Sequence, residues 1–366
     1  MERSMSENHP LGSNDSALHQ LAKAFEKAAH ELYMPDCPLY AELSTSIAHD
    51  RDLLALAAYT RPGQAPTVLL LYIVHYLLLR GEKQPLAEFY VSLTDHPKPP
   101  EDAPPVFADF CCEHREEIRG LLTTRLVQTN EVLRSALLLP AIMLALQKAG
   151  DAPLALVGLG ASAGLNLLFD KYGYDYGNGL RCGDLSSPLQ LSCKPRGSLR
   201  PPIPTVMPKI ASRIGIDLNP LDARNQDDYL WLFAQIWPEH SFKSRAQNMR
   251  VAVELVRESP PKMITGDIVT VLPEVVTTIP EDQAICLLHS FSFYELPDGV
   301  REKIISIITR CAAKRRILSV GLEFGPHLLT IAAELRLSCY QPNGKVEIKK
   351  LAECHEHGEW MEWLYS

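Results

Sequence analysis

The 366-residue sequence has no long basic run and no long apolar run, and these absences exclude several classes of protein. Lys and Arg total 36 against 44 Asp and Glu, a formal net charge of −8, so we expect no nucleic-acid partner. The longest apolar stretch, residues 67–79, contains His75 and is shorter than the roughly 20 residues of a membrane-spanning helix. We therefore expect a buried helix there and no membrane partner.

Paired cysteine motifs are also missing. The nine cysteines are odd in number and scattered, without any C-x-x-C spacing, which favours reduced thiols. The first 16 residues are polar and lack the apolar core of a secretory signal, so we expect a cytoplasmic protein. Cys354, His355 and His357 are able to bind a metal, but no second ligand group accompanies them, and we predict no metal site.

The composition is that of a globular chain, with 46% apolar and 22% charged residues, and the length allows two domains. We expect a disordered tail over residues 1–16 and an α-helical N-terminal domain over residues 17–150. Apolar residues recur at helical intervals in the second range. The expected helices include residues 53–59, 68–79 and 132–147, and a Pro-rich loop is expected over 97–105.

The pattern changes at residue 151. Short apolar runs at residues 154–157, 214–216, 264, 284–288 and 317–322 alternate with helical patterns at 227–237, 244–258 and 297–313. This alternation predicts an α/β domain over residues 151–366, with a mainly parallel sheet and helices on both faces. Ligands of such sheets bind at the carboxyl ends of the strands.

The first of these apolar runs ends in a glycine turn. Gly160, Ser162 and Gly164 alternate with Ala161 and Ala163, and a helix-like segment that contains Asn166 follows. Small residues in a strand-to-helix turn allow a ligand to approach the backbone. A turn that only packs a helix against a strand has the same pattern, so the turn alone does not predict binding.

Polar residues also follow three later runs. Asp217 and Asn219 are placed where a carboxylate accepts hydrogen bonds from ribose hydroxyls, and Asp267 is placed to accept from the exocyclic amine of an adenine. His289 and Ser290 follow the next run. Each residue alone is more often a helix cap or a turn residue. Their joint order is typical of a class I S-adenosylmethionine (SAM) methyltransferase, a Rossmann-like fold.

Four segments carry a family resemblance: RLVQTNE (125–131), GASAGLN (160–166), GIDLNPLD (215–222) and LLHSFSFYELP (287–297). They resemble a bacterial family known as domain of unknown function 2332, over about residues 39–323. The resemblance implies a class I methyltransferase fold behind a helical domain. The chain is also similar to the azetidine-2-carboxylate synthases, which cyclise SAM and release methylthioadenosine.

The types and positions of other residues suggest further site residues. Gln128 and Asn130 would reach the cleft as amide ligands, and Arg125 would pair with a carboxylate or form an inter-domain salt bridge. Tyr172, Tyr174 and Tyr176 form the densest aromatic cluster. Their rings would face the sulfonium and their hydroxyls would orient the amine, or they would pack the following insert.

One position departs from the methyltransferase pattern. Methyltransferases have an acidic residue two positions before the first glycine, where this chain has Gly158. A carboxylate there would favour the charged form of the methionyl amine of SAM, and its absence would favour the neutral amine.

We therefore predict a SAM-dependent enzyme with SAM as its substrate. The leading hypothesis is cyclisation of SAM to azetidine-2-carboxylic acid, with Tyr172, Tyr174, Tyr176 and Asn130 as catalytic residues. The alternative is methyl transfer to a small-molecule acceptor, and a non-catalytic SAM or nucleotide sensor is a third hypothesis. A homodimer stays open.

Overall fold

The computed structural model describes residues 15–81, 84–150, 152–294, 296–325 and 332–365. The chain divides into two compact units: unit 1 comprises Met1–Thr129 and Gln226–Ala246, and unit 2 comprises Asn130–Asn225 and Gln247–Ser366. The observed division differs from the predicted boundary at residue 150 in two respects. Residues 130–150 group with the sheet, and residues 226–246 group with the N-terminal helices.

The described residues of unit 1 form helices joined by loops, without a strand. Its α-helices are α1 (Asp15–Lys27), α2 (Pro38–His49), α3 (Arg51–Ala57), α4 (Pro66–Arg80), α5 (Ala103–Glu113), α6 (Arg115–Thr124) and α8 (Gln226–Ala234), with a π-helical turn η1 (Ala28–Tyr33) and 3-10 turns η2 (Pro85–Phe89) and η3 (Pro100–Asp102). The predicted helices at 53–59 and 68–79 correspond to α3 and α4. Helix α1 starts within the predicted tail, and residues 1–14 lie outside the described part.

The strongly apolar helix α4 is the centre of unit 1. Ten consecutive residues, 69–78, are buried, including His75, because this helix is covered on all sides. His75 Nδ1 lies 2.9 Å from the Ala234 carbonyl oxygen and Nε2 lies 2.7 Å from Ser92 Oγ. No helix in the described parts of the chain combines the length and the apolar character that a bilayer crossing requires.

Unit 2 contains a nine-stranded sheet, in the order β5-β12-β11-β10-β9-β8-β1-β6-β7. Its strands are β1 (Leu154–Leu159), β5 (Lys194–Arg196), β6 (Ile210–Asp217), β7 (Lys262–Thr265), β8 (Ala284–Ser290), β9 (Ile317–Phe324), β10 (Ala333–Tyr340), β11 (Val346–Cys354) and β12 (Trp360–Trp363). The five strands β7-β6-β1-β8-β9 are mutually parallel, whereas β9 to β12 form antiparallel pairs. The unit is thus a mixed α/β structure with a mostly parallel central sheet.

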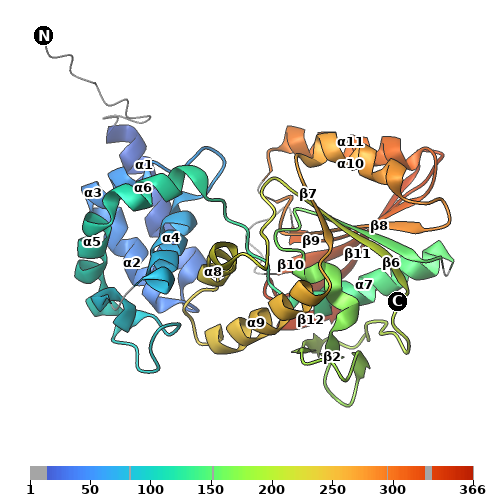
Figure 1. Cartoon of the computed structure of the whole chain (residues 1–366), viewed down its shortest axis with the longest axis horizontal. Helices are drawn as coiled ribbons and strands as arrows, with labels where there is room; N and C mark the ends of the chain where they lie inside the picture. Colours follow the sequence, from blue (N-terminus) through green and yellow to red (C-terminus); the bar gives the residue numbers. More distant parts are fainter. Residues whose placement is uncertain (1–14, 82–83, 151, 295, 326–331, 366) are drawn as a thin grey trace, which may run out of the picture. The chain divides into compact units, whose positions relative to one another are not determined.

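Helices cover both faces of this sheet, as Figure 1 shows. Helices α10 (Ile268–Thr278) and α11 (Asp298–Ala312) pack on one face, and α7 (Arg134–Ala149) packs on the other against β8, β9 and β10. Ala155, Val157 and Leu159 of β1 belong to the core under α10 and α11. Because strand side chains alternate, the intervening residues of β1 face the opposite side. Helix α9 (Phe242–Glu258) is divided between the two units at residue 246.

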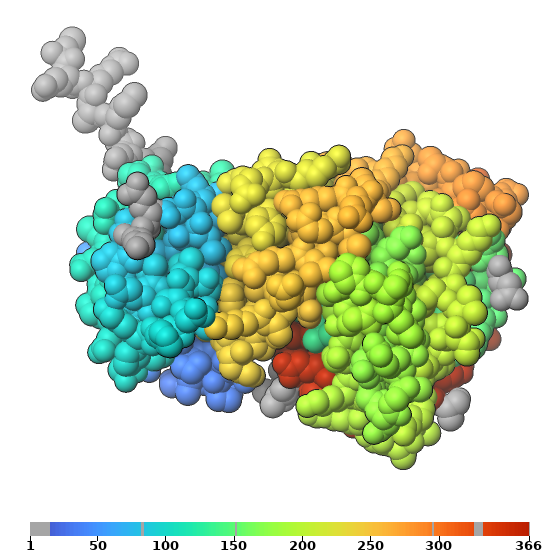
Figure 2. Space-filling model, turned by 60° about the horizontal axis from the view of Figure 1, so that its bottom comes forward, coloured from blue at the N-terminus to red at the C-terminus, as the bar shows by residue number. Residues whose placement is uncertain are grey.

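A smaller sheet follows the first strand. The 3-10 segment η4 (Leu165–Lys171) leads into β2 (Gly173–Asp175), β3 (Arg181–Gly183) and β4 (Gln190–Ser192), in the order β3-β2-β4. Figure 2 shows the segment that carries this sheet, in green, at the surface of the molecule. The predicted helix-like segment 165–170 is therefore a 3-10 segment, with non-helical dihedral angles at Leu168.

Candidate functional site

The turn after β1 requires its glycines. Gly160 and Gly164 have φ values of 71° and 75°, a region that side chains disfavour. A Cβ on Gly160 would lie 2.6 Å from Ser292 Cβ, and one on Gly164 would lie 2.7 Å from Pro261 Cγ. Ser162 also has a positive φ, 52°. The turn is therefore held in an uncommon conformation by close neighbours.

Asp217 at the end of β6 fastens this turn. Its Oδ2 accepts a hydrogen bond of 2.8 Å from the Ser162 amide, and its Oδ1 accepts one of 2.9 Å from the Asn219 amide. Its main-chain carbonyl accepts from the Gly266 amide, at the end of β7. The side chain is buried. Asp217 thus joins three successive strand ends.

Asp267 is the N-cap of α10. Its Oδ1 accepts a hydrogen bond of 2.8 Å from the Val269 amide, and the residue is exposed. The capping interaction accounts for an acidic residue at this position. An adenine contact through the remaining oxygen stays a prediction.

The predicted residue His289 has a carboxylate partner that the sequence analysis missed. His289 Nδ1 lies 2.7 Å from Glu323 Oε1, at the ends of β8 and β9. A carboxylate only accepts hydrogen bonds, so Nδ1 donates and Nε2 is the acceptor of the neutral ring. The ring stacks on Phe293 with centroids 4.1 Å apart, and a Cβ on Gly321 would overlap it. Gly321 is thus needed for the position of the imidazole.

Glu323 also organises the loop after β8. Its carboxylate accepts from the main-chain amides of Ser292, Phe293 and Tyr294, at 3.1–3.3 Å. The Ser292 hydroxyl donates to the Leu159 carbonyl at 2.8 Å, which ties the loop to the end of β1. The ends of β1, β8 and β9 are therefore connected through this one loop.

A group of three aromatic side chains lies beside the Glu323 carboxylate. Phe291, Tyr294 and Phe324 contact one another edge-to-face, with centroids 4.8–5.9 Å apart. The Arg134 guanidinium lies 4.3 Å from the Phe291 ring centroid, so one face of this group already contacts a cation. Phe291 has a φ of 54°, and such outliers are frequent at ligand sites. A carboxylate at the end of the 317–322 apolar run was the signal that would have revealed this region.

Ser290, the other predicted site residue on β8, differs from His289 in its hydrogen bonding. Its Oγ is buried and has no hydrogen-bond partner among the described residues. An unpaired buried hydroxyl is costly and is often a position where a ligand or water completes the hydrogen bonding.

Asn130 and Asn166 lie together beside the glycine turn. Asn130 Oδ1 accepts a hydrogen bond of 3.1 Å from the Leu165 amide, and the Ser135 hydroxyl donates to Asn166 Oδ1 at 2.8 Å. Asn130 is only 7% exposed. The structure therefore brings both amides to the β1 turn, where they fix the start of η4.

The three tyrosines do not have the predicted exposure to a ligand. Tyr172, Tyr174 and Tyr176 are fully buried, and burial raises the pKa of each hydroxyl, so all three are protonated donors. The hydroxyls donate to the main-chain carbonyls of Leu165, Phe169 and Ala136, respectively. They stabilise η4 and its neighbours, which is the packing role that the sequence analysis had left open, and they are positioning residues at most.

Arg125 and Gln128 belong to unit 1 and have partners within it. The Arg125 guanidinium pairs with Asp227 and lies 5.0 Å from the Tyr76 ring centroid. The Gln128 main-chain amide donates to Gln235 Oε1 at 2.6 Å. The Asp227 pair is thus internal to unit 1, and a ligand role for Arg125 stays a prediction.

The structure also bears on metal and thiol chemistry. Over the residues that the structure describes, His, Cys, Asp and Glu side chains nowhere gather in threes around a candidate metal position. All nine cysteines are unpaired, and seven of them are buried. Burial raises the pKa of the Cys286 thiol on β8 to about 12, so it is not a nucleophile at neutral pH.

Comparison with known proteins places the chain in a family. One family model, described as an uncharacterized protein conserved in bacteria, matches residues 22–363. The chain belongs to the DUF2332 family. No curated protein and no solved structure matches it. The matched range of this DUF2332 protein includes the glycine turn, Asp217 and the His289–Glu323 pair. The family description states no activity, so a function must be inferred from these residues.

Proposed function

We propose that this DUF2332 protein binds SAM at the carboxyl edge of its parallel sheet and cyclises it to azetidine-2-carboxylic acid and methylthioadenosine. The fold proposed with it is Rossmann-like, related to the class I methyltransferases. Numbered along the chain, the five parallel strands have the order 3-2-1-4-5, which is the doubly wound order. Such sheets bind nucleotides where the order reverses, here between β1 and β8.

The observation that carries the proposal is the placement of Asp217 against the glycine turn. The carboxylate lies at the end of β6, directly bonded to the turn after β1. A ribose that rests on this turn would bring its hydroxyls beside the Asp217 carboxylate, and a carboxylate at this place in a doubly wound sheet is suited to accept hydrogen bonds from ribose hydroxyls. The glycine turn and the Asp217 carboxylate together suit the nucleoside part of SAM.

The neighbouring aromatic group supports a cationic ligand. Phe291, Tyr294 and Phe324 offer ring faces and edges, and Glu323 supplies negative charge beside them. A sulfonium gains about 0.5–2 kcal/mol from such ring faces, depending on its desolvation. Ser290 Oγ, buried without a partner in the described structure, offers a hydrogen bond to the methionyl group.

His289 is the proton acceptor that we assign. An α-amine with a pKa of about 8 is roughly one-tenth neutral at pH 7, so one proton must leave before the attack. His289 Nε2 takes that proton while Glu323 holds Nδ1–H. The amine lone pair then forms the N–Cγ bond, the Cγ–S bond breaks, and its electron pair goes to sulfur. The products are the cyclic amino acid, neutral methylthioadenosine and one proton.

Gly158 favours cyclisation over methyl transfer. A Cβ there would lie 3.0 Å from Ala161 Cβ and 3.3 Å from a Leu167 methyl carbon, so a longer side chain does not fit without displacement. The carboxylate that would pair with the ammonium is therefore excluded sterically as well as missing. For the same reason Gly158→Glu would overpack the turn and is unsuitable as a test of amine charge.

Incubation of the full-length protein with SAM alone, followed by mass spectrometry, tests the proposal. We expect equal amounts of methylthioadenosine and azetidine-2-carboxylate. His289→Gln should reduce both at least tenfold, whereas His96→Gln, a change at an exposed histidine of unit 1, should reduce neither. S-adenosylhomocysteine formed only with an added acceptor would support the methyltransferase alternative. Binding of SAM without turnover would support the sensor, and absence of binding would refute all three.

A further inference from the structure

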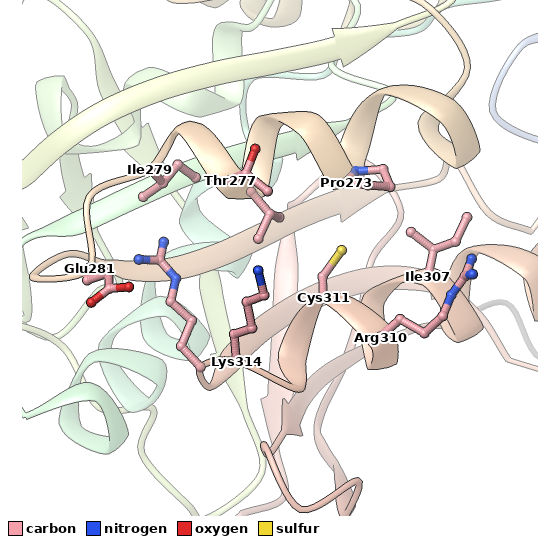
Figure 3. A pocket seen from close by; sticks show the side chains of 10 residues that line it. Pro273, Thr277, Ile279, Glu281, Ile307, Arg310, Cys311 and Lys314 are labelled. Atoms are coloured by element: carbon pink, nitrogen blue, oxygen red, sulfur yellow. The ribbon is translucent and has the colours of Figure 1, made fainter.

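A cavity of about 430 Å³ lies between α10 and α11, on the outer side of unit 2 (Figure 3). Its walls are apolar where the helices face each other, through Pro273, Val276 and Ile307. Arg310, Lys314 and Arg315 line it as well, and Glu281 is the one acidic residue of the lining. The cavity is large enough for a small organic ligand.

The charge of this lining is unusual for the chain. Three cations and one carboxylate give a formal local charge of +2, against −8 for the whole sequence. A cation in the last turn of a helix is favoured by the helix dipole, which accounts for Arg310 at the end of α11. That effect does not account for Lys314 and Arg315, which follow the helix and line the same cavity.

Arg315 has an unsatisfied donor. Its Nη1 donates to the Pro280 carbonyl at 2.6 Å, but its Nη2 is buried and has no hydrogen-bond partner among the described residues. Burial lowers the pKa of this guanidinium, and the nearby carboxylates of Glu281 and Asp282 oppose that effect only in part. A covered charged donor without a partner is costly, and a shift of the Arg315 side chain toward an anion in the cavity would remove that cost.

We propose that this cavity binds a small amphipathic carboxylate, with its carboxylate on Arg315 and Lys314 and its aliphatic part between Val276 and Ile307. A carboxylate pairs with a guanidinium through two parallel hydrogen bonds, and Nη2 supplies one of them. The site is separate from the strand-end residues and does not depend on SAM binding.

The reactivity of the Cys311 thiol can report directly on whether a ligand occupies the cavity. Its side chain points into the cavity in Figure 3 and is partly exposed. Cys112 in unit 1 is exposed, and the other seven cysteines are buried, so these two thiols are the ones that a reagent reaches. Decanoate in the cavity should slow labelling of Cys311 by a maleimide at least fivefold and leave the labelling of Cys112 unchanged. Decanol, which has the same chain without the charge, should protect Cys311 less.

Calorimetry of decanoate binding to the full-length protein completes the test. Arg315→Gln should weaken binding at least tenfold, and Arg316→Gln, a change at the neighbouring exposed arginine outside the lining, should not. Asp217→Ala should also leave decanoate binding intact, which separates this proposal from the proposed function. Equal affinities of the two arginine variants, equal protection by decanol, or no binding at millimolar decanoate would overturn the proposal.

Discussion

Removal of the Asp217 carboxylate should weaken SAM binding and loosen the glycine turn together. Asp217→Ala deletes the hydrogen bonds that the carboxylate accepts from the amides of Ser162 and Asn219. Each hydrogen bond to a charged group contributes about 1.5–3 kcal/mol, and the side chain is only 8% exposed, so we expect unit 2 to lose about 3 kcal/mol of stability. Loss of the ribose contact should cost about 1–3 kcal/mol in SAM affinity, or about 5- to 150-fold.

Asp50→Ala is the matched control. Asp50 caps α3 by accepting from the amides of Asp52 and Leu53, so this variant also deletes two carboxylate–amide hydrogen bonds. These bonds are at the surface of unit 1, and their loss should cost about 1 kcal/mol. Calorimetry with SAM and hydrogen exchange of the peptide that contains Ser162 are the measurements. We expect faster exchange and weaker binding only in Asp217→Ala.

One result would refute the structural role of Asp217, and a second would refute its binding role. Unchanged exchange at Ser162 would show that the carboxylate does not fasten the turn. Faster exchange with unchanged SAM affinity would show that Asp217 is structural and that the nucleoside binds elsewhere.

Three further predictions concern other parts of the chain. Gly321→Ala should displace the His289 ring and reduce SAM turnover at least tenfold with little change in SAM affinity; equal turnover would contradict the proton-acceptor role. Tyr176→Phe should cost about 1 kcal/mol of stability, measured by urea unfolding, and leave turnover unchanged, since its hydroxyl bonds the Ala136 carbonyl; a large loss of turnover would restore the catalytic role. Burial lowers the pKa of His75 from 6.5 to about 4, so the unfolded chain binds more protons between these values, and unit 1 should lose up to about 3 kcal/mol as the pH falls from 6.5 to 4. His75→Gln should flatten this dependence, and an unchanged slope would assign it to other groups.

The continuous apolar runs made the central strands predictable. Residues 154–157 and 284–288 are buried on both faces of the sheet, so they carry no polar interruption, and they correspond to β1 and β8. The apolar runs did not predict strand β10, because its sequence, AELRLSCY, alternates apolar and polar residues and contains no continuous apolar run. Helix α10 was missed because Pro273 and several β-branched residues obscure its helical pattern.

The candidate site was only partly predictable for a related reason. Asp217 and His289 follow recognisable apolar runs, so their place at the sheet edge could be deduced. The pairing of His289 with Glu323 joins residues 34 positions apart, and only the parallel register of β8 and β9 brings them together. The burial of Tyr176 depends on its contact with the Ala136 carbonyl of α7, which no local pattern reveals. The grouping of α8 with the N-terminal helices is non-local in the same way.

The short strand β5 has a consequence for the solubility of the protein. It pairs with β12 and forms one edge of the nine-stranded sheet, through the sequence Lys194-Pro195-Arg196. A proline offers no amide hydrogen to a further strand, and two cations repel an identical edge. The sheet is thus protected at this edge against strand-to-strand aggregation, and replacement of Pro195 and both cations by β-branched residues would remove that protection.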